Sequence, residues 1–342
     1  MDKILEVNHL RVSFHTYAGE VKAVRGVDFE LNRGETLAFV GESGCGKTVT
    51  AMAVMRLLQP PFAEIKQDSK IIYEDKDVMK MTKKELQAYR GNEVSMIFQD
   101  PMTSLNPTMT VGKQIMESLM LHRGLNKKEA REEAVRMLKV VRIPDAEKRV
   151  DAYPHQLSGG MRQRVMIAIA LSCNPALLIA DEPTTALDVT IQAQIMELLS
   201  DLKKDMNTAI ILVTHDLGVV ANFADRIQVM YAGQIVERGT AKEIFYNAKH
   251  PYTWALLSSI PTIDSENKRD LYALKGTPPD LILDMNHCPF AERCEYCMKI
   301  CKETIPEETK IGESHKVSCW LQHPDAPKVE SYYERRGGKT HE

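Results

Sequence analysis

The order of apolar and polar residues divides the chain into segments with two different periods. Near the N-terminus, β-branched and aromatic residues alternate with polar ones, which predicts short strands with turns between them. These stretches are ILEVNHLRVSF (4–14), VKAVRGVDFEL (21–31) and ETLAFV (35–40). The segment TVTAMAVMRLLQP that follows has a helical pattern, which we expect Pro60 and Pro61 to end.

The middle of the chain changes from strand-like to helical patterns. SKIIYEDKDV (69–78) and VSMIF (94–98) read as strands. From about residue 110 to 150 the pattern is helical and highly charged, as in NKKEAREEAVRMLKVV. We therefore expect an inserted helical subdomain over about 100–165.

Strands and helices then alternate, which is typical of a parallel sheet covered on both faces. The expected elements are a helix in RQRVMIAIALSC, a strand in ALLIAD, a helix in VTIQAQIMELLSDLKKD, a strand in AIILVTH and a hairpin turning at Ala232–Gly233. After residue 250 prolines become frequent and the periodicity weakens. The sequence thus predicts an α/β domain over 1–250, an irregular cysteine-rich extension over 251–330 and a disordered tail over 331–342.

Composition and charge exclude several classes of protein. The 342 residues are 44% hydrophobic and 27% charged, and the formal net charge of −3 gives no basic field for nucleic acid. No apolar run reaches the length of a membrane span, and the charged N-terminus does not resemble a signal peptide. We expect a cytosolic chain with reduced thiols, in which disulfides are disfavoured.

The stretch GESGCGKT, 41–48, has the spacing of a phosphate-binding loop between a predicted strand and a helix. Gly41, Gly44 and Gly46 let successive amides point at phosphate oxygens, and the helix adds its positive N-terminal end. Lys47 supplies a charge to the phosphates, and the Thr48 hydroxyl can ligate Mg²⁺. The other expected nucleotide contacts come from Ser43, from the backbone amide of Cys45 and from Thr50.

Two further stretches suit the same chemistry. The predicted strand ALLIAD delivers Asp181 and Glu182 at its carboxyl end, where Asp181 would hold the Mg²⁺ shell and Glu182 would polarise the attacking water. In QLSGGMRQR, Ser158, Gly159 and Gly160 begin a helix. That arrangement is an ordinary N-cap, and it is also a second place where amides and a helix dipole can face an anion.

At this point the sequence resembles a known family, the ABC-type ATPases. LSGGM matches the family's signature motif, which lies between its Walker A and Walker B motifs. Gln99 in IFQDP matches the Q-loop, Asp188 in TTALD the D-loop and His215 in LVTHD the switch histidine. The resemblance covers at least residues 1–245 and implies a P-loop NTPase fold with a RecA-like parallel sheet, an N-terminal antiparallel β subdomain and the helical insert.

The resemblance also implies a site shared by two chains. In this family two nucleotide-binding domains pack head to tail, so that each ATP lies between one Walker A loop and the other signature motif. Gln99 would then contact the metal shell, His215 the γ-phosphate, and Asp188 would reach across the dimer. Adenine usually stacks on an aromatic residue near the N-terminus; Phe14 and Tyr17 are both candidates, and Tyr17 is preferred.

Family membership alone does not fix the function. A soluble ABC ATPase acting on DNA or ribosomes is expected to have a long coiled-coil insertion, tandem cassettes or a basic face, and the sequence has none of these. FQDPMTSLNPTMTVG and HPYTWALLSSIP are similar to the ATPase subunits of oligopeptide and dipeptide importers, with nickel importers of the same group as the alternative. This group implies a second homologous ATPase subunit, two membrane-spanning permease subunits and an external binding protein, with the chain peripheral on the cytoplasmic membrane face.

Five of the seven cysteines fall between residues 288 and 319, with the spacing C-x5-C-x2-C-x3-C before the last. Zinc favours two C-x2-C pairs, and only Cys294–Cys297 qualifies; x2 followed by x3 is closer to an iron–sulfur pattern.

Some peptide-permease ATPases carry a 4Fe–4S cluster in this part of the chain, and their cluster-binding site begins with the motif C-P-F-x-x-R-C, which CPFAERC matches. That resemblance implies the ligands Cys288, Cys294, Cys301 and Cys319, with Cys297 in place of Cys301 as the alternative. His287 and His315 are expected to be flanking polar residues, and zinc remains the other candidate metal.

Overall fold

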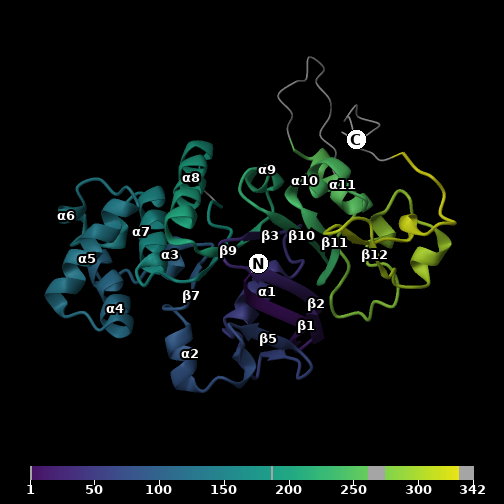
Figure 1. Ribbon diagram of the computed structural model, residues 1–342. Coiled ribbons are helices and arrows are strands. Elements are labelled where there is room, and N and C mark those ends of the chain that lie inside the picture. Colours follow the sequence, from purple (N-terminus) through teal and green to yellow (C-terminus); the bar gives the residue numbers. More distant parts are fainter. Residues whose placement is uncertain (1, 186–187, 261–273, 331–342) are drawn as a thin grey trace, which may run out of the picture. The chain divides into compact units, whose positions relative to one another are not determined.

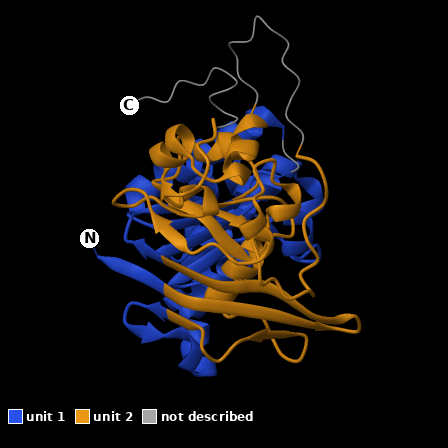
Figure 2. Cartoon of the chain, turned by 90° about the vertical axis from the view of Figure 1, so that its right-hand side faces the viewer, with its two compact units in different colours: residues 1–6, 30–36, 72–213 blue, residues 7–29, 37–71, 214–342 orange. Residues whose placement is uncertain are grey.

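The computed structural model describes residues 2–185, 188–260 and 274–330 (Figure 1). The chain forms two compact units, one of residues 1–6, 30–36 and 72–213 and the other of residues 7–29, 37–71 and 214–342 (Figure 2). The predicted tail over 331–342 lies outside the described residues.

The first unit contains a parallel sheet of three buried strands. These are β7 (Val94–Ile97), β8 (Leu177–Asp181) and β9 (Ala209–Thr214), with Ser95 opposite Leu178 and Ile179 opposite Ile211. Apart from Ser95, Asp181 and Thr214, their side chains are apolar, as expected for parallel strands that helices cover on both faces. The connecting helices α7 (Gly159–Leu171) and α8 (Val189–Met206) confirm the predicted alternation of strands and helices.

Helices from the middle of the chain pack together in the same unit, where the sequence predicts the helical insert. They comprise α3 (Pro101–Ser104), α4 (Val111–Arg123), α5 (Lys127–Val140) and α6 (Ala146–Arg149). The short hairpin of β5 (Lys70–Tyr73) and β6 (Lys76–Asp77) and the helix α2 (Lys83–Tyr89) precede this insert in the chain. Asn126 caps α5 in a reciprocal capping box with Glu129, and Gly124 ends α4 in the left-handed conformation. The charged face of α5 stays exposed while Ala134 and Leu138 are buried.

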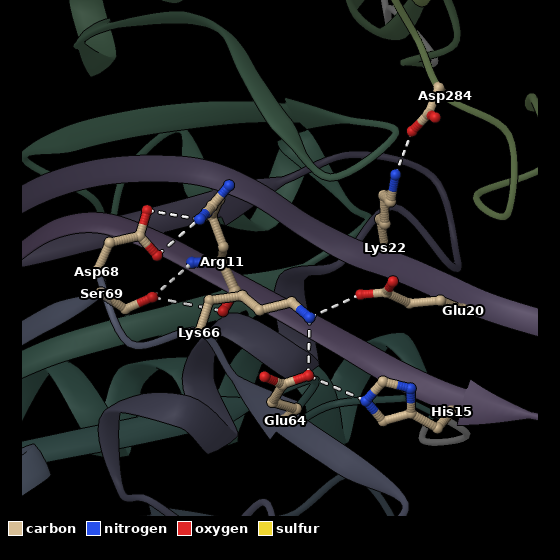
Figure 3. Close-up of polar contacts among 9 residues, drawn as sticks. All are labelled: Arg11, His15, Glu20, Lys22, Glu64, Lys66, Asp68, Ser69 and Asp284. Atoms are coloured by element: carbon tan, nitrogen blue, oxygen red, sulfur yellow. Dashed lines mark hydrogen bonds and ion pairs between the residues drawn. The ribbon is translucent and has the colours of Figure 1, made fainter.

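The N-terminal sheet is antiparallel, as predicted. β1 (Lys3–Thr16) and β2 (Gly19–Asn32) form a hairpin, and β4 (Ala63–Ile65) pairs with β1 through Val12 and Ile65. Its outer surface carries ion pairs such as Lys66 with Glu20 at 2.8 Å (Figure 3). Because solvent still reaches these half-buried groups and screens their charges, we expect each pair to contribute less than about 1 kcal/mol.

The helix after the glycine-rich loop is shorter than predicted. α1 spans Lys47–Val54 and ends before Pro60 and Pro61. Arg56 adopts a positive φ of 50°, while its amide donates to Ala53 O at 2.8 Å and the Leu57 amide donates to Met52 O at 2.9 Å. These two bonds form a Schellman motif, which satisfies the last carbonyls of the helix. The expected role of the prolines in ending the helix was therefore wrong.

The second unit extends its sheet with strands that lie late in the sequence. β10 (Arg226–Tyr231) is parallel to β3 (Thr36–Val40), and β11 (Gln234–Thr240) returns antiparallel after the predicted turn at Ala232–Gly233, whose φ values are 47° and 80°. β13 (Lys316–Ser318) then pairs with β11, and β12 (Glu308–Lys310) pairs with β13. The sheet thus runs across the predicted boundary at residue 250. The helices α9 (Leu217–Val220), α10 (Ala241–Asn247) and α11 (Pro251–Ser258) flank these strands in sequence.

A buried carboxylate, Glu237 of β11, connects three parts of this region. It is 1% exposed and accepts hydrogen bonds from the amides of Lys249 at 2.6 Å and His250 at 3.1 Å. It also forms a hydrogen bond of 2.8 Å with the His315 imidazole. A buried carboxylate needs such partners to offset the loss of water. Glu237 therefore ties the start of α11 and the segment before β13 to the same strand.

Burial of His250 makes the stability of this region depend on pH. Burial lowers the pKa of His250 to about 4, and its Nδ1 accepts the Tyr252 amide at 3.0 Å as the cap of α11. The unfolded chain binds the proton near about pH 6.5, so stability is complete above that pH and falls as the pH drops toward about 4. We expect His250→Asn, which keeps a capping acceptor, to remove about 2 kcal/mol of the loss between about pH 7 and about pH 4.5 in urea unfolding. The exposed His155→Asn is the control, and an equal pH dependence in both variants would contradict this assignment.

Candidate functional site

The glycine-rich loop lies between β3 and α1, as the motif requires. Gly41, Gly44 and Gly46 have φ values of 153°, 78° and 106°. A Cβ at Gly41 would lie 2.2 Å from Met230 O, and one at Gly46 would lie 2.5 Å from Ala23 O. Glycine is therefore required at both positions by close approach of the backbone as well as by conformation.

Lys47 holds a buried positive charge inside this loop. It is 4% exposed, and its Nζ donates to Gly41 O at 2.7 Å and to Glu42 O at 2.9 Å. Burial raises the pKa of the neighbouring Cys45 thiol, which keeps that thiol protonated near neutral pH. The loop thus combines an ammonium group with a helix N-terminus, which suits a phosphate group.

The other predicted residues in and near this loop differ in their exposure to solvent. Ser43 and Gly44 are exposed, and Thr48 is half-buried. Thr50 is buried, and its hydroxyl donates to Gly46 O at 3.0 Å. The Thr50 side chain is therefore engaged with the backbone of its own helix.

The two predicted carboxylates lie at the end of β8 in the first unit, where Asp181 is the last residue of the strand and Glu182 follows it. Asp181 is 3% exposed at the end of the strand. Glu182 has a φ of 46°, and its amide donates to Val213 O at 2.8 Å. Such a conformation costs about 1–3 kcal/mol in a residue other than glycine, and it is common at functional sites.

The structure brings Gln99 and Glu182 together, although they are 83 residues apart. Gln99 Nε2 donates to Glu182 Oε2 at 3.1 Å, and Thr185 Oγ1 donates to the same oxygen at 2.8 Å. These bonds orient the carboxylate. The sequence predictions did not include Thr185 as a site residue, because they considered only the acidic residues Glu182 and Asp188 on either side of it.

The signature stretch LSGGM (157–161) forms the start of α7, and the N-terminus of this helix is exposed. Ser158 Oγ accepts the Met161 amide at 3.3 Å as the N-cap. A Cβ at Gly160 would lie 3.0 Å from the Ile191 side chain, so packing against α8 explains this glycine. A Cβ at Gly159 would meet nothing within 4 Å. Internal packing therefore does not explain Gly159, which is exposed.

Three further predicted residues lie on the surface. Asp188 is exposed and caps α8, with Oδ1 accepting the Ile191 amide at 3.0 Å. His215 is exposed directly after β9. Tyr17 is fully exposed in the turn between β1 and β2, whereas Phe14 is half-buried. Exposure leaves Tyr17 the more accessible of the two aromatic rings.

The cysteines of the C-terminal region are free thiols. Within residues 2–185, 188–260 and 274–330, no group of three or more His, Cys, Asp or Glu side chains is arranged to hold a metal ion. Burial, with a smaller contribution from neighbouring thiols, raises the pKa of Cys288 to about 11 and that of Cys294 to about 12. The Cys288 amide also donates to Cys301 O at 3.0 Å. The thiols are neighbours, but their positions are not those of metal ligands.

Contacts between this C-terminal region and the loop were not predicted. Arg293 forms an ion pair with Glu42 at 2.6 Å, and the Glu42 amide donates to the Tyr252 hydroxyl at 2.8 Å. Arg293 is part of CPFAERC, where only the cysteines attracted interpretation. No local pattern could have revealed a contact between residues 251 positions apart.

Family models match two parts of the chain. A model described as ABC transporter matches residues 24–185, and one described as oligopeptide/dipeptide transporter, C-terminal region matches residues 236–301. No helix in the described part of the chain has the length and apolar character needed to cross a membrane.

Known proteins resemble the chain over most of its length. The oligopeptide transport ATP-binding protein OppD of Bacillus subtilis is 58% identical over 328 residues, covering 96% of this chain and 91% of the relative. The dipeptide transport ATP-binding protein DppD of the same organism is 54% identical over 322 residues, covering 94% of this chain and 96% of the relative. Among solved structures, the dimeric post-hydrolysis state of the ATP-binding cassette MJ0796 bound to ADP and Pi has a TM-score of 0.62 and 26% identity, covering 70% of this chain and 99% of that one.

Proposed function

Because this chain belongs to the ABC transporter family of ATP-binding proteins, we propose that it is the ATP-hydrolysing subunit of a membrane importer for oligopeptides or dipeptides. The observation that carries this proposal is the combination of a phosphate-binding loop with a C-terminal region that matches the oligopeptide/dipeptide transporter model. Nickel import by the same kind of subunit is the alternative cargo.

In the proposed site, Gly41 to Thr48 bind the phosphates of ATP, and Lys47 neutralises part of their charge. Thr48, Gln99 and Asp181 would hold Mg²⁺, which supplies positive charge to the transferred phosphoryl group. Glu182 accepts a proton from the attacking water. The hydrogen bonds that its carboxylate accepts from Gln99 and Thr185 fix the orientation of this carboxylate and support the role. His215 would contact the γ-phosphate, and Tyr17 would stack on adenine.

We further propose that a second ATPase subunit completes each site. The open N-terminus of α7 supports this, because Ser158 and Gly159 are exposed and Gly159 has no packing role. Helix N-termini bind anions, so this end can face a triphosphate held by another chain. Asp188 would reach across the same contact. Two permease subunits and an external binding protein would complete a transporter, with this chain peripheral on the cytoplasmic face of the membrane.

The cargo is tested by transport in cells that lack this subunit. We would compare uptake of a labelled oligopeptide with uptake of nickel before and after the gene is restored. The proposal requires peptide uptake to return with the wild-type chain and not with Lys47→Ala. Restoration of nickel uptake alone would favour the alternative cargo.

We also propose that Cys288, Cys294, Cys301 and Cys319 hold a 4Fe–4S cluster, with zinc as the alternative. Support comes from the proximity of the thiols, since, after burial, Cys288, Cys294 and Cys301 each raise the pKa of the Cys319 thiol. Because the thiols are not arranged as ligands, binding would require them to move and to lose protons. We expect the anaerobically purified chain to absorb near about 400 nm and to contain about four irons, as iron–sulfur ligation requires. A colourless chain with stoichiometric zinc would reverse this choice.

A further inference from the structure

The phosphate-binding loop carries an acidic side chain that a distant residue neutralises. Arg293 Nη1 donates to Glu42 Oε2 at 2.6 Å, and Nη2 donates to Oε1 at 2.9 Å. This bidentate geometry is the strongest form of an arginine–carboxylate pair. The Arg293 side chain is 4% exposed and Glu42 is 31% exposed, so solvent screens the pair only in part.

Several contacts fix Arg293 in this position. Its Nε donates to Lys275 O at 3.0 Å, and Nη1 also donates to the Tyr231 hydroxyl at 3.2 Å. Phe290 packs against Tyr231 and Tyr252, with ring centroids 5.2 Å and 5.4 Å away. The Tyr252 hydroxyl accepts the Glu42 amide, so both the backbone and the side chain of Glu42 are held by this region.

The charge of Glu42 matters because of its place in the loop. Glu42 directly follows Gly41, and its carbonyl accepts a hydrogen bond from Lys47 Nζ at 2.9 Å. An unpaired carboxylate in this loop would repel a triphosphate, while a paired one adds no net charge. Arg293 therefore removes an electrostatic obstacle to an anionic ligand.

We propose that Arg293 is a positioning residue for ATP binding, which acts by neutralising and orienting Glu42. The C-terminal region thus completes the phosphate-binding loop of its own chain. This inference rests on the proposed ATP-binding function.

The test measures ATP affinity of the full-length subunit by displacement of a fluorescent ATP analogue. We expect Arg293→Gln to weaken ATP binding about tenfold, because the freed carboxylate repels the phosphates. Adding Glu42→Gln to that variant should restore affinity to within about threefold of the wild type, as a double-mutant cycle requires for a charge effect. Asp284→Asn is the matched control, because it removes a different ion pair of the same segment, with Lys22, in which no residue of the loop takes part (Figure 3).

The outcomes separate this inference from the function on which it rests. Unchanged affinity in Arg293→Gln, or equally weak binding in the single and double variants, would overturn the charge-neutralising role. Should Arg293→Gln fail to fold, Glu42→Gln tests the same claim, since the remaining arginine should make ATP bind at least about twofold more tightly. If the wild-type chain did not bind ATP, the proposed ATP-hydrolysing function itself would be contradicted.

Discussion

Replacing Glu182 by Gln is expected to lower steady-state ATP hydrolysis by about 10²-fold to 10⁴-fold, the usual contribution of a general base. The substitution keeps the shape of the side chain and leaves an oxygen to accept from Gln99 and Thr185. It removes the group that takes a proton from water. ATP binding should persist, because Gly41 to Thr48 are unchanged.

The measurement combines phosphate release with size-exclusion chromatography of the purified ATPase subunits. ATP that is bound and not hydrolysed should hold two subunits together, so the variant should elute as a dimer in ATP. Glu197→Gln is the control, because Glu197 is an exposed carboxylate of α8 in the same unit. A Glu182→Gln variant that hydrolyses ATP at the normal rate would refute the assigned role.

Gly159→Asp is expected to abolish ATP-dependent association of the subunits and to lower hydrolysis by at least about 10²-fold, since it places a negative charge where a phosphate of the partner site would lie. The fold should tolerate the change, because a Cβ at Gly159 meets nothing within 4 Å. A carboxylate in the first turn of a helix is even locally favourable. The expected defect is therefore one of binding between chains.

Association in ATP is measured by light scattering, and thermal unfolding checks the fold of the single chain. Lys127→Asp provides the comparison, because it also puts a carboxylate at the exposed first position of a helix, α5. That variant should associate and hydrolyse ATP as the wild type does. Normal association of Gly159→Asp would show that the N-terminus of α7 does not face a partner's nucleotide.

Local sequence patterns predicted the elements whose residues are close together in the chain. The strand, glycine loop and helix from Thr36 to Val54 follow from spacing alone, as does the hairpin at Ala232–Gly233. The end of α1 was misplaced, because the Schellman motif at Arg56 has no distinctive residue type. Pro60 and Pro61 are residues that commonly end helices, but α1 ends before them, so they gave the wrong position for its C-terminus.

Contacts between distant residues could not be predicted in this way. β13 joins β11 from a segment whose periodicity is weak, and Arg293 reaches Glu42 from a stretch read only for its cysteines. Gln99 was singled out by resemblance to a family and Glu182 by its place at the end of a predicted strand, but their direct hydrogen bond was not predicted. Pairing across the chain depends on tertiary packing, which local propensity does not record.

The pairing of β13 with β11 limits how this protein can be divided or transplanted. A chain cut after residue 250 would leave β11 as a bare sheet edge and would strip Glu237 of its His315 partner. Bare edges invite aggregation, and a buried carboxylate with a missing donor destabilises the strand that carries it. The segment that follows residue 250 is thus part of the ATPase body rather than a detachable module, and grafting it between relatives requires the matching strand as well.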